Sequence, residues 1–422
     1  MPKAHYFAGQ ADILWEHWSD AAAEFTGELA LVPADPDAKF NLGFVALQQS
    51  KTEEAAELFR QILVLHPDHA KTQYELGKML LDRGQVKEAI EHLEAAARLS
   101  PQADYVHYQL QAAYLALTAN IVTAAVKEAS LRAQIEATER IASDEADQLG
   151  VLGQQFDLGG VSRTAVLAQQ TLLAQTRATL PPLRQSLDQV RHQLAVLAGM
   201  LPSDPTLPEF RLDMFSLPET LPVSLPSALV RQRPDILAAD AVLHQASAQI
   251  GVATAALYPQ ITLSASYGAE ALAPSQVFKP GSTIWSLGAG LLQPVFHGGQ
   301  LSAQKRAAEA AYEQAGAQYR ETVLLAFQNV ADSLRALDHD ATGLRAQTDA
   351  WRAASDSLDL TRGQYRVGGV SYLSLLDAQR QYQQTVTSLA QAQASRYADT
   401  AALFQALGGG WWNAPPSAPP PH

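Results

Sequence analysis

The sequence predicts a mainly α-helical protein. We expect a helical-repeat domain at the N-terminus, followed by long antiparallel helical hairpins or coiled coils and a single two-stranded β-hairpin. Three observations support this fold class: a short repeat near the N-terminus, a much longer repeat through the rest of the chain, and two runs that alternate between apolar and small or polar side chains. Each of these periods is typical of one kind of structure.

Residues 1–117 carry the shorter repeat. Pro33, Pro67 and Pro101 follow one another at a constant step of 34 in residue number. Small residues where two helices cross, and a proline after the second helix, are typical of tetratricopeptide repeats. We expect three helix pairs, capped by a further helix at 105–114. The same step relates glycine, aromatic and alanine positions: Gly9, Gly43 and Gly77; Tyr6, Phe40 and Tyr74; Ala21, Ala55 and Ala89.

A tetratricopeptide array stacks its helix pairs and presents a concave face. That face suits an extended peptide or a helix of a partner protein, so the array predicts a peptide or protein ligand. An array that serves only as a spacer fits the same pattern. The sequence names no ligand.

Two runs between residues 258 and 300 have the period of β-strands. Isoleucine, leucine and tyrosine alternate with threonine and serine in the first run, and tryptophan and leucine alternate with serine and glycine in the second. Each run is about ten residues long, enough to cross a bilayer as a tilted strand. A hairpin lying on the helices of a soluble protein fits the same alternation. The apolar positions that would face lipid are Ile261, Leu263, Tyr267, Trp285, Leu287 and Leu291.

Residues 118–412 contain two related halves. The segment Phe-Asp-Leu-Gly-Gly-Val-Ser at 156–162 returns as Tyr-Arg-Val-Gly-Gly-Val-Ser at 365–371, a step of 209 in residue number. In each half we expect a helix, a turn and a second helix, because a Gly-Gly pair supplies the left-handed backbone that reverses the chain. Either half taken alone also fits an ordinary soluble helical hairpin. The turn residues are Gly159, Gly160, Gly368 and Gly369.

The second half also carries a helix, two strands and a helix within 227–326, and the first half lacks them. The same step would place their counterparts before residue 118, where the tetratricopeptide repeats lie. We therefore expect a first strand pair to be replaced by the repeats, with a junction near Leu117 and Thr118. Residues 201–226 are rich in proline and predict an extended connection, and residues 413–422 predict a disordered Pro-rich tail.

Composition excludes several classes of protein. The net charge of −13 argues against a nucleic-acid partner, and the absence of cysteine excludes disulfides and thiolate metal sites. No metalloprotease, phosphate-loop or serine-hydrolase motif is present, so we expect no enzyme and no cofactor. His66 and His69 flank a Pro-Asp turn and predict a surface turn rather than a metal site.

Five short motifs, in order, resemble TolC-type outer-membrane efflux proteins, and more closely their NodT/OprM-like branch. They stand at 225–236, 248–253, 258–261, 294–299 and 365–371, and the resemblance covers about residues 118–412. It implies a trimer that forms a tunnel across the outer membrane of a Gram-negative bacterium. A periplasmic adaptor and an inner-membrane pump would be its partners, and small molecules or drugs its cargo.

The N-terminal dozen residues conflict with that location. They lack the apolar core of a signal peptide, and no apolar run has the length that predicts a transmembrane helix. A chain that is complete as written is therefore expected in the cytoplasm. A fused or mis-started reading frame is an alternative explanation.

The strand count is a second departure from the family. The resemblance implies a twelve-stranded barrel with four strands from each of three subunits, whereas this sequence predicts two strands. Six strands leave little or no lumen, because barrel diameter grows with strand number. Either more subunits assemble, another protein supplies strands, or the chain does not form a working channel.

The resemblance also places a pore gate at the tip of the helices. There the family constricts its tunnel with acidic residues, a tyrosine and an arginine. The tyrosine position is Tyr365 and one acidic position is Asp377, whereas the second acidic position holds Ser374 and the matching polar position in the first half holds Thr164. A ring of Asp377 carboxylates from several copies would favour cations. A solvated aspartate at a helix end is the alternative.

These features predict an outer-membrane efflux channel subunit that carries a protein-binding repeat module. The alternative is a soluble tetratricopeptide scaffold with a non-conducting remnant of an efflux protein.

Overall fold

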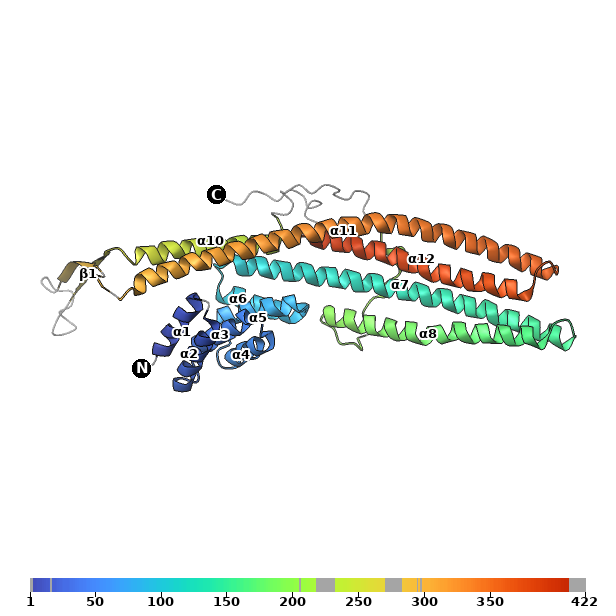
Figure 1. Cartoon of the computed structure of the whole chain (residues 1–422), viewed down its shortest axis with the longest axis horizontal. Helices are drawn as coiled ribbons and strands as arrows, with labels where there is room; N and C mark the ends of the chain where they lie inside the picture. The colour runs from blue at the N-terminus through green and yellow to red at the C-terminus, as the bar shows by residue number, and fades with distance from the viewer. Residues whose placement is uncertain are drawn as a thin grey trace. The chain divides into compact units, whose positions relative to one another are not determined.

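The computed structural model describes residues 3–15, 17–204, 206–217, 232–269, 283–293, 295–296 and 298–409. Helices account for most of them, and one two-stranded sheet completes the secondary structure of these residues (Figure 1). The chain forms two compact units: residues 1–76, 95–108 and 235–322 make the first, and residues 77–94, 109–234 and 323–422 make the second. The predicted mainly helical fold is confirmed.

The tetratricopeptide repeats form six short helices. Their bounds are α1 Ala4–Leu14, α2 Trp18–Leu31, α3 Pro36–Gln48, α4 Thr52–Leu65, α5 Ala70–Asp82 and α6 Val86–Leu99. The repeated glycines lie where the two helices of a pair touch. A Cβ atom at Gly43 would lie 2.6 Å from the Phe59 ring, and one at Gly77 would lie 2.8 Å from the Leu93 side chain. Phe59 and Leu93 are fully buried, so the repeated small and large residues form the crossing points of the helix pairs.

The helix predicted to cap the array is the beginning of a much longer one. Helix α7, Asp104–Asp157, is 54 residues long and runs through Leu117 and Thr118 without a break. The predicted junction therefore falls inside a helix. By length and composition, α7 is also the one helix among the described residues that could cross a membrane, with 28% of the relevant stretch buried. No such helix is expected from the sequence, because residues 105–126 mix apolar with uncharged polar side chains.

The internal duplication is confirmed by the helix bounds. Helix α8 spans Arg163–Leu197 and α12 spans Tyr372–Ala406, and both contain 35 residues. The same step in residue number that separates Gly159 from Gly368 separates the first residues of the two helices, and it also separates their last residues. It relates the end of α7 at Asp157 to the end of α11, Gln300–Arg366, in the same way. The second unit thus contains two long antiparallel helical hairpins, α7–α8 and α11–α12 (Figure 1).

The predicted β-hairpin is confirmed with its expected faces. Helix α10, Pro234–Ala255, precedes strands β1, Gln260–Ala269, and β2, Thr283–Leu292, which pair antiparallel. Tyr267 lies opposite Trp285, and these two side chains are 83% and 74% exposed. On the other face the Ser266 and Ser286 hydroxyl oxygens are 2.8 Å apart. The six predicted apolar positions share one exposed face, whereas serine, threonine and glycine line most of the other, with Ile284 and Leu292 near its ends.

Parts of the predicted motifs lie outside the described residues. These are residues 225–231 of the first motif, Pro294 and His297 of the fourth motif, and the Pro-rich tail at 413–422.

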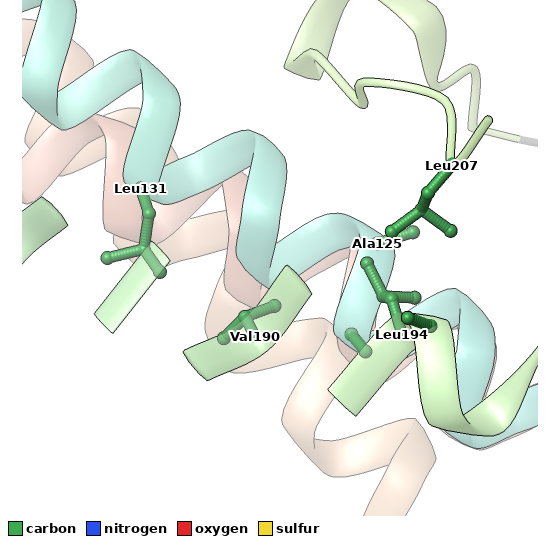
Figure 2. Close-up of a cluster of buried hydrophobic side chains, with 7 residues drawn as sticks. Ala125, Leu131, Val190, Leu194 and Leu207 are labelled. Atoms are coloured by element: carbon green, nitrogen blue, oxygen red, sulfur yellow. The ribbon is translucent and has the colours of Figure 1, made fainter. Parts of the chain in front are cut away.

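Apolar side chains fill the interior of each helical hairpin. Leu131 from α7 packs in one cluster with Val190 and Leu194 from α8, and Leu207 from the following connection covers them (Figure 2). In the other hairpin the cluster is formed by Val330 and Leu337 from α11 with Leu403, Ala406 and Leu407 at the end of α12. Burial of such side chains contributes about 1.5–3 kcal/mol for each residue.

The connection between the two halves is tied to both hairpins. The Arg132 guanidinium on α7 lies 3.2 Å from the Glu209 carboxylate. The Tyr397 hydroxyl on α12 donates a hydrogen bond of 3.0 Å to the Phe215 carbonyl, and the two rings lie 5.6 Å apart. Between them the connection forms one short 3₁₀ turn, Leu212–Met214. We call residues 206–217 the strap, because they span from the first hairpin to the second.

The helix crossings of the repeats can be tested at Gly43. We expect Gly43→Ala to destabilise the chain by about 1–2 kcal/mol, since the added methyl group overlaps the buried Phe59 ring. Chemical denaturation followed by circular dichroism measures this. Gly343→Ala is the matched control: it lies on exposed helix with open space around it, and there alanine should stabilise by about 0.5–1 kcal/mol. Equal effects of both variants would contradict the close approach.

Candidate functional site at the helix tips

Both helical hairpins reverse direction through the same turn. Gly159 and Gly368 have φ angles of 74° and 75°, in the left-handed region that glycine adopts without strain. The next glycine closes the helix end: the Gly160 amide donates to the Gln155 carbonyl at 2.7 Å, and the Gly369 amide donates to the Gln364 carbonyl at 2.8 Å. The predicted Gly-Gly turns therefore lie at the tips of the hairpins.

A serine begins the returning helix at each tip. The Ser162 hydroxyl accepts a hydrogen bond from the Ala165 amide at 3.3 Å, and the Ser371 hydroxyl accepts one from the Ser374 amide at 3.2 Å. These caps satisfy amides at the helix start that have no partner within the helix. The residue before each turn glycine is apolar and open to solvent, with Leu158 87% exposed and Val367 83% exposed. The tips thus combine a rigid turn with an exposed apolar side chain.

Tyr365 packs inside the second hairpin rather than on its surface. Its ring borders the buried cluster of Leu358, Leu375 and Ala378, and its centroid lies 5.5 Å from that of Tyr372. Burial raises the pKa of the Tyr365 hydroxyl above its ordinary value.

The other three predicted gate residues are solvent-exposed and do not meet within one chain. The Asp377 carboxylate is 69% exposed and lies 3.5 Å from the Arg380 guanidinium on the same helix. The Ser374 hydroxyl lies 2.9 Å from the Ser371 hydroxyl, and Thr164 is exposed near the start of α8. The structure thus brings Tyr365 next to Tyr372 and not next to Asp377.

Polar side chains link the two hairpins near their tips. Three hydrogen bonds cross between α7–α8 and α11–α12 near the tips. We call these contacts the polar seam; their partners are Arg362 with Asp144 at 3.3 Å, Gln379 with Gln148 at 2.7 Å, and Tyr372 with Gln169.

Glu145 lies buried next to this seam. Its side chain is 1% exposed, and neither carboxylate oxygen accepts a hydrogen bond from the described residues. Its backbone carbonyl accepts a hydrogen bond of 2.9 Å from the Gln169 amide. Burial raises the pKa of the Glu145 carboxyl, the neighbouring Asp144 raises it further, and the nearby Thr176 hydroxyl lowers it in part. The protonated form is therefore favoured relative to an exposed glutamate.

Sequence reasoning missed most of this buried polar group. No sequence pattern placed Glu145, Gln148, Gln169 or Tyr372 at a site. A signal existed at Gln169, which shares one buried stripe of α8 with Leu172, Leu173 and Thr176. A glutamine in an apolar helical stripe indicates that the stripe faces a polar partner.

No metal site accompanies these groups. Within the described ranges, no three histidine, aspartate or glutamate side chains are placed to hold a metal ion.

Comparison with known proteins matches the two parts of the chain separately. Residues 225–409 match the family described as outer membrane efflux protein. Residues 16–70, 45–104 and 74–139 match the tetratricopeptide repeat.

The chain is similar to curated outer-membrane proteins over about 70% of its length. It is 32% identical over 298 residues to the pyoverdine export outer membrane protein OpmQ of Pseudomonas aeruginosa, covering 70% of this chain and 62% of that protein. It is 30% identical to the probable efflux pump outer membrane protein TtgC of Pseudomonas putida, covering 71% and 61%. The chain thus spans less than two thirds of the length of these relatives.

Solved channel structures share the fold. The outer membrane protein VceC of Vibrio cholerae superposes with a TM-score of 0.63 at 26% identity, covering 77% of this chain and 76% of VceC. The outer-membrane channel OprN superposes with a TM-score of 0.65 at 28% identity, covering 77% and 72%.

Long helical hairpins with an apolar β-hairpin thus give the chain the fold of solved TolC-like outer-membrane channels. Residues 225–409 carry an outer membrane efflux protein domain, and tetratricopeptide repeats precede it.

The buried carboxyl beside the seam gives a pH-dependent prediction. Because the folded state raises the pKa of Glu145, its stabilising proton is present at low pH and is lost as the pH rises above the ordinary value of 4.5. We expect Glu145→Gln to raise the thermal unfolding temperature at about pH 8 and to leave it unchanged at about pH 4.5. Asp147→Asn, an exposed change on the same helix, is the control. An equal effect of Glu145→Gln at both pH values would contradict the prediction.

Proposed function

We propose that this protein is an outer-membrane efflux channel subunit in which the repeats add a protein-binding module. The observation that carries the proposal is the β-hairpin, whose six apolar side chains on one face are 72–83% exposed. Water disfavours such a face, whereas a lipid bilayer covers it. The outer membrane efflux protein domain at residues 225–409 supports the same function.

The helical hairpins suit the helical part of a tunnel, which would continue from the β-hairpin. Their helices are long, and each hairpin ends at a Gly-Gly tip. We propose that several copies, three as in the family's trimer, line a tunnel with these helices. Tyr365, Asp377, Ser374 and Thr164 would then contribute to its constriction at the tips.

The tips also suit contact with other proteins of an export system. Residues 159–171 and 368–379 combine the exposed apolar residues before the turns with capped helix starts. We propose that a periplasmic adaptor docks there and connects the tunnel to an inner-membrane pump. The cargo would be small molecules, in line with relatives that are named for the export of pyoverdine and for efflux.

The domain organisation follows from the same features. We propose that residues 1–117 bind a peptide or protein, that 118–412 form the efflux domain, and that 413–422 form a tail. The protein would then reside in the outer membrane of a Gram-negative bacterium. The repeats would place a partner protein next to the channel.

The internal repeat indicates where a first strand pair would lie in this chain. Moving β1 and β2 back by the step that separates Gly368 from Gly159 leads to 51–60 and 74–83, and these positions lie in α4 and α5 and the turns beside them. The helices of the repeats thus occupy the place of a first strand pair. We propose that the edges of β1 and β2 are paired by strands from further copies or from another protein, since unpaired edges are not tolerated in lipid.

The presence of repeat helices in the place of a first strand pair also favours a second candidate function. A soluble tetratricopeptide scaffold with a non-conducting efflux remnant would need no closed sheet, and its repeats would carry the function.

The location of the protein separates the two candidates. We expect the chain, expressed from its own upstream region, to be recovered in the outer membrane as a heat-modifiable oligomer. The variant Leu263→Arg/Leu287→Arg should abolish this recovery, because each arginine near the bilayer midplane costs about 2–4 kcal/mol. Ser264→Arg, on the opposite face of the hairpin, is the matched control and should be tolerated. Recovery of the parent chain in the soluble fraction would rule out the channel.

The constriction is tested by ion selectivity. In planar bilayers we expect Asp377→Asn to reduce the preference for cations, since a ring of carboxylates selects them electrostatically. The reversal potential in a salt gradient measures this preference. Asp356→Asn, an exposed change of equal charge in α11, should leave the reversal potential unchanged. If the two variants shifted it equally, Asp377 would not line the constriction.

A further inference from the structure

The internal repeat allows the two helical hairpins to be compared position by position. In the first hairpin Leu131 and Val190 belong to the apolar cluster that joins α7 and α8 (Figure 2). Their equivalents in the second hairpin, found by the step that relates Gly159 to Gly368, are Asp340 on α11 and Asp399 on α12. The second hairpin therefore places two carboxyl groups where the first one packs two aliphatic side chains.

The surroundings of this carboxyl pair remain those of a packed core. Leu337, one turn before Asp340, is 6% exposed, and Thr400, next to Asp399, is 5% exposed. The Asp340 side chain is half-buried, and its Oδ2 atom is buried without a partner among the described residues. Because Leu131 and Val190 belong to one cluster, the equivalent Asp340 and Asp399 carboxyl groups face each other across α11 and α12, and Asp399 acts on Asp340. Two carboxyl groups can form a hydrogen bond only if one of them carries a proton.

Nearby charges do not neutralise the pair. Arg396 is the cation that acts on Asp340 from α12, and its Nη1 atom donates a hydrogen bond of 3.0 Å to the Leu337 carbonyl. His339 acts from the same helix and is exposed. Burial, followed by the interaction with the Asp399 carboxyl group, raises the pKa of Asp340 to about 6, against the smaller opposing effects of Arg396 and His339.

We propose that Asp340 and Asp399 form a proton-binding site that fastens α11 to α12 at the level of the strap. When the helices are packed, the pair binds one proton from solvent and shares it in an O–H···O⁻ hydrogen bond. When that proton is lost, two carboxylates face each other in a poorly solvated contact and the helices separate locally. The site is a property of the hairpin, so it stands whether or not the protein conducts.

The carboxyl pair lies close to residues of α12 that contact the strap. Arg396 and Tyr397 lie within one turn of Asp399 on α12. Both line a recess of about 410 Å³ with Leu212 and Asp213 of the strap. The Tyr397 hydroxyl also holds the strap through the Phe215 carbonyl. Loosening of α12 at Asp399 therefore weakens the tie between the second hairpin and the strap.

The direction of the pH dependence follows from the raised pKa. A carboxyl group that binds its proton more tightly in the folded state stabilises that state at low pH. This contribution is lost as the pH rises from the ordinary value of 3.8 through about 6. The first hairpin has Leu131 and Val190 at these positions and lacks this response.

Hydrogen exchange on the full-length protein tests the proposal. Exchange rates are measured by mass spectrometry at about pH 5 and about pH 7.5 and corrected for the intrinsic chemical rate. We expect amides in 335–345 and 394–404 to exchange roughly tenfold faster at the higher pH. The matching segments 126–136 and 185–195 of the first hairpin should show no such change and serve as the internal control.

Variants assign the effect to the carboxyl pair. Asp340→Leu/Asp399→Val copies the first hairpin and should abolish the pH difference, whereas the exposed change Asp338→Asn should retain it. Should the double variant misfold, seen as fast exchange throughout α11 and α12, Asp399→Asn carries the same test because it removes one charge and keeps a hydrogen-bond partner. A pH difference that is absent from the parent, or that survives in Asp399→Asn, would overturn the proposal.

Discussion

Apolar contact inside each helical hairpin is the interaction on which the second unit depends. Helices as long as α8 and α12 are stable only where a partner helix packs along them. The apolar clusters around Leu194 in the first hairpin and Leu403 in the second provide this packing. Each buried aliphatic side chain contributes about 1.5–3 kcal/mol. These contacts lie within a hairpin and hold its two helices together.

Hydrogen bonds of the polar seam link the two hairpins near their tips. Hydrogen bonds such as the one between Gln148 and Gln379 contribute only about 0.5–1.5 kcal/mol each, because water replaces them when they break. Buried carboxyl groups add a dependence on pH: Glu145 lies beside the seam, and Asp340 lies inside the second hairpin.

Periodic features were predictable from the sequence, and features that depend on which faces meet were not. The short repeat, the long repeat and the strand alternation predicted the tetratricopeptide helices, both helical hairpins and the β-hairpin, because each period is set by local backbone geometry. The seam was missed because a helical period does not say which neighbour a face will contact. The predicted gate residue Asp377 is exposed in one chain, so its role depends on symmetry-related copies that no single sequence can arrange. The predicted junction at Thr118 lies inside α7. The repeat pattern ends near that residue, but the helix that begins at Asp104 as the last repeat helix continues to Asp157.

The equal lengths of α8 and α12 impose a rule on how this protein can change during evolution. Each residue inserted into one helix advances its end by about 1.5 Å and rotates it by about 100°. An insertion in α8 alone would move the Gly159 tip out of level with the Gly368 tip and turn Gln169 away from Tyr372. Tolerated length changes in the helical domain are therefore expected in multiples of about seven residues, inherited together by all four long helices. Relatives with longer or shorter bundles should differ by the same increment in both halves.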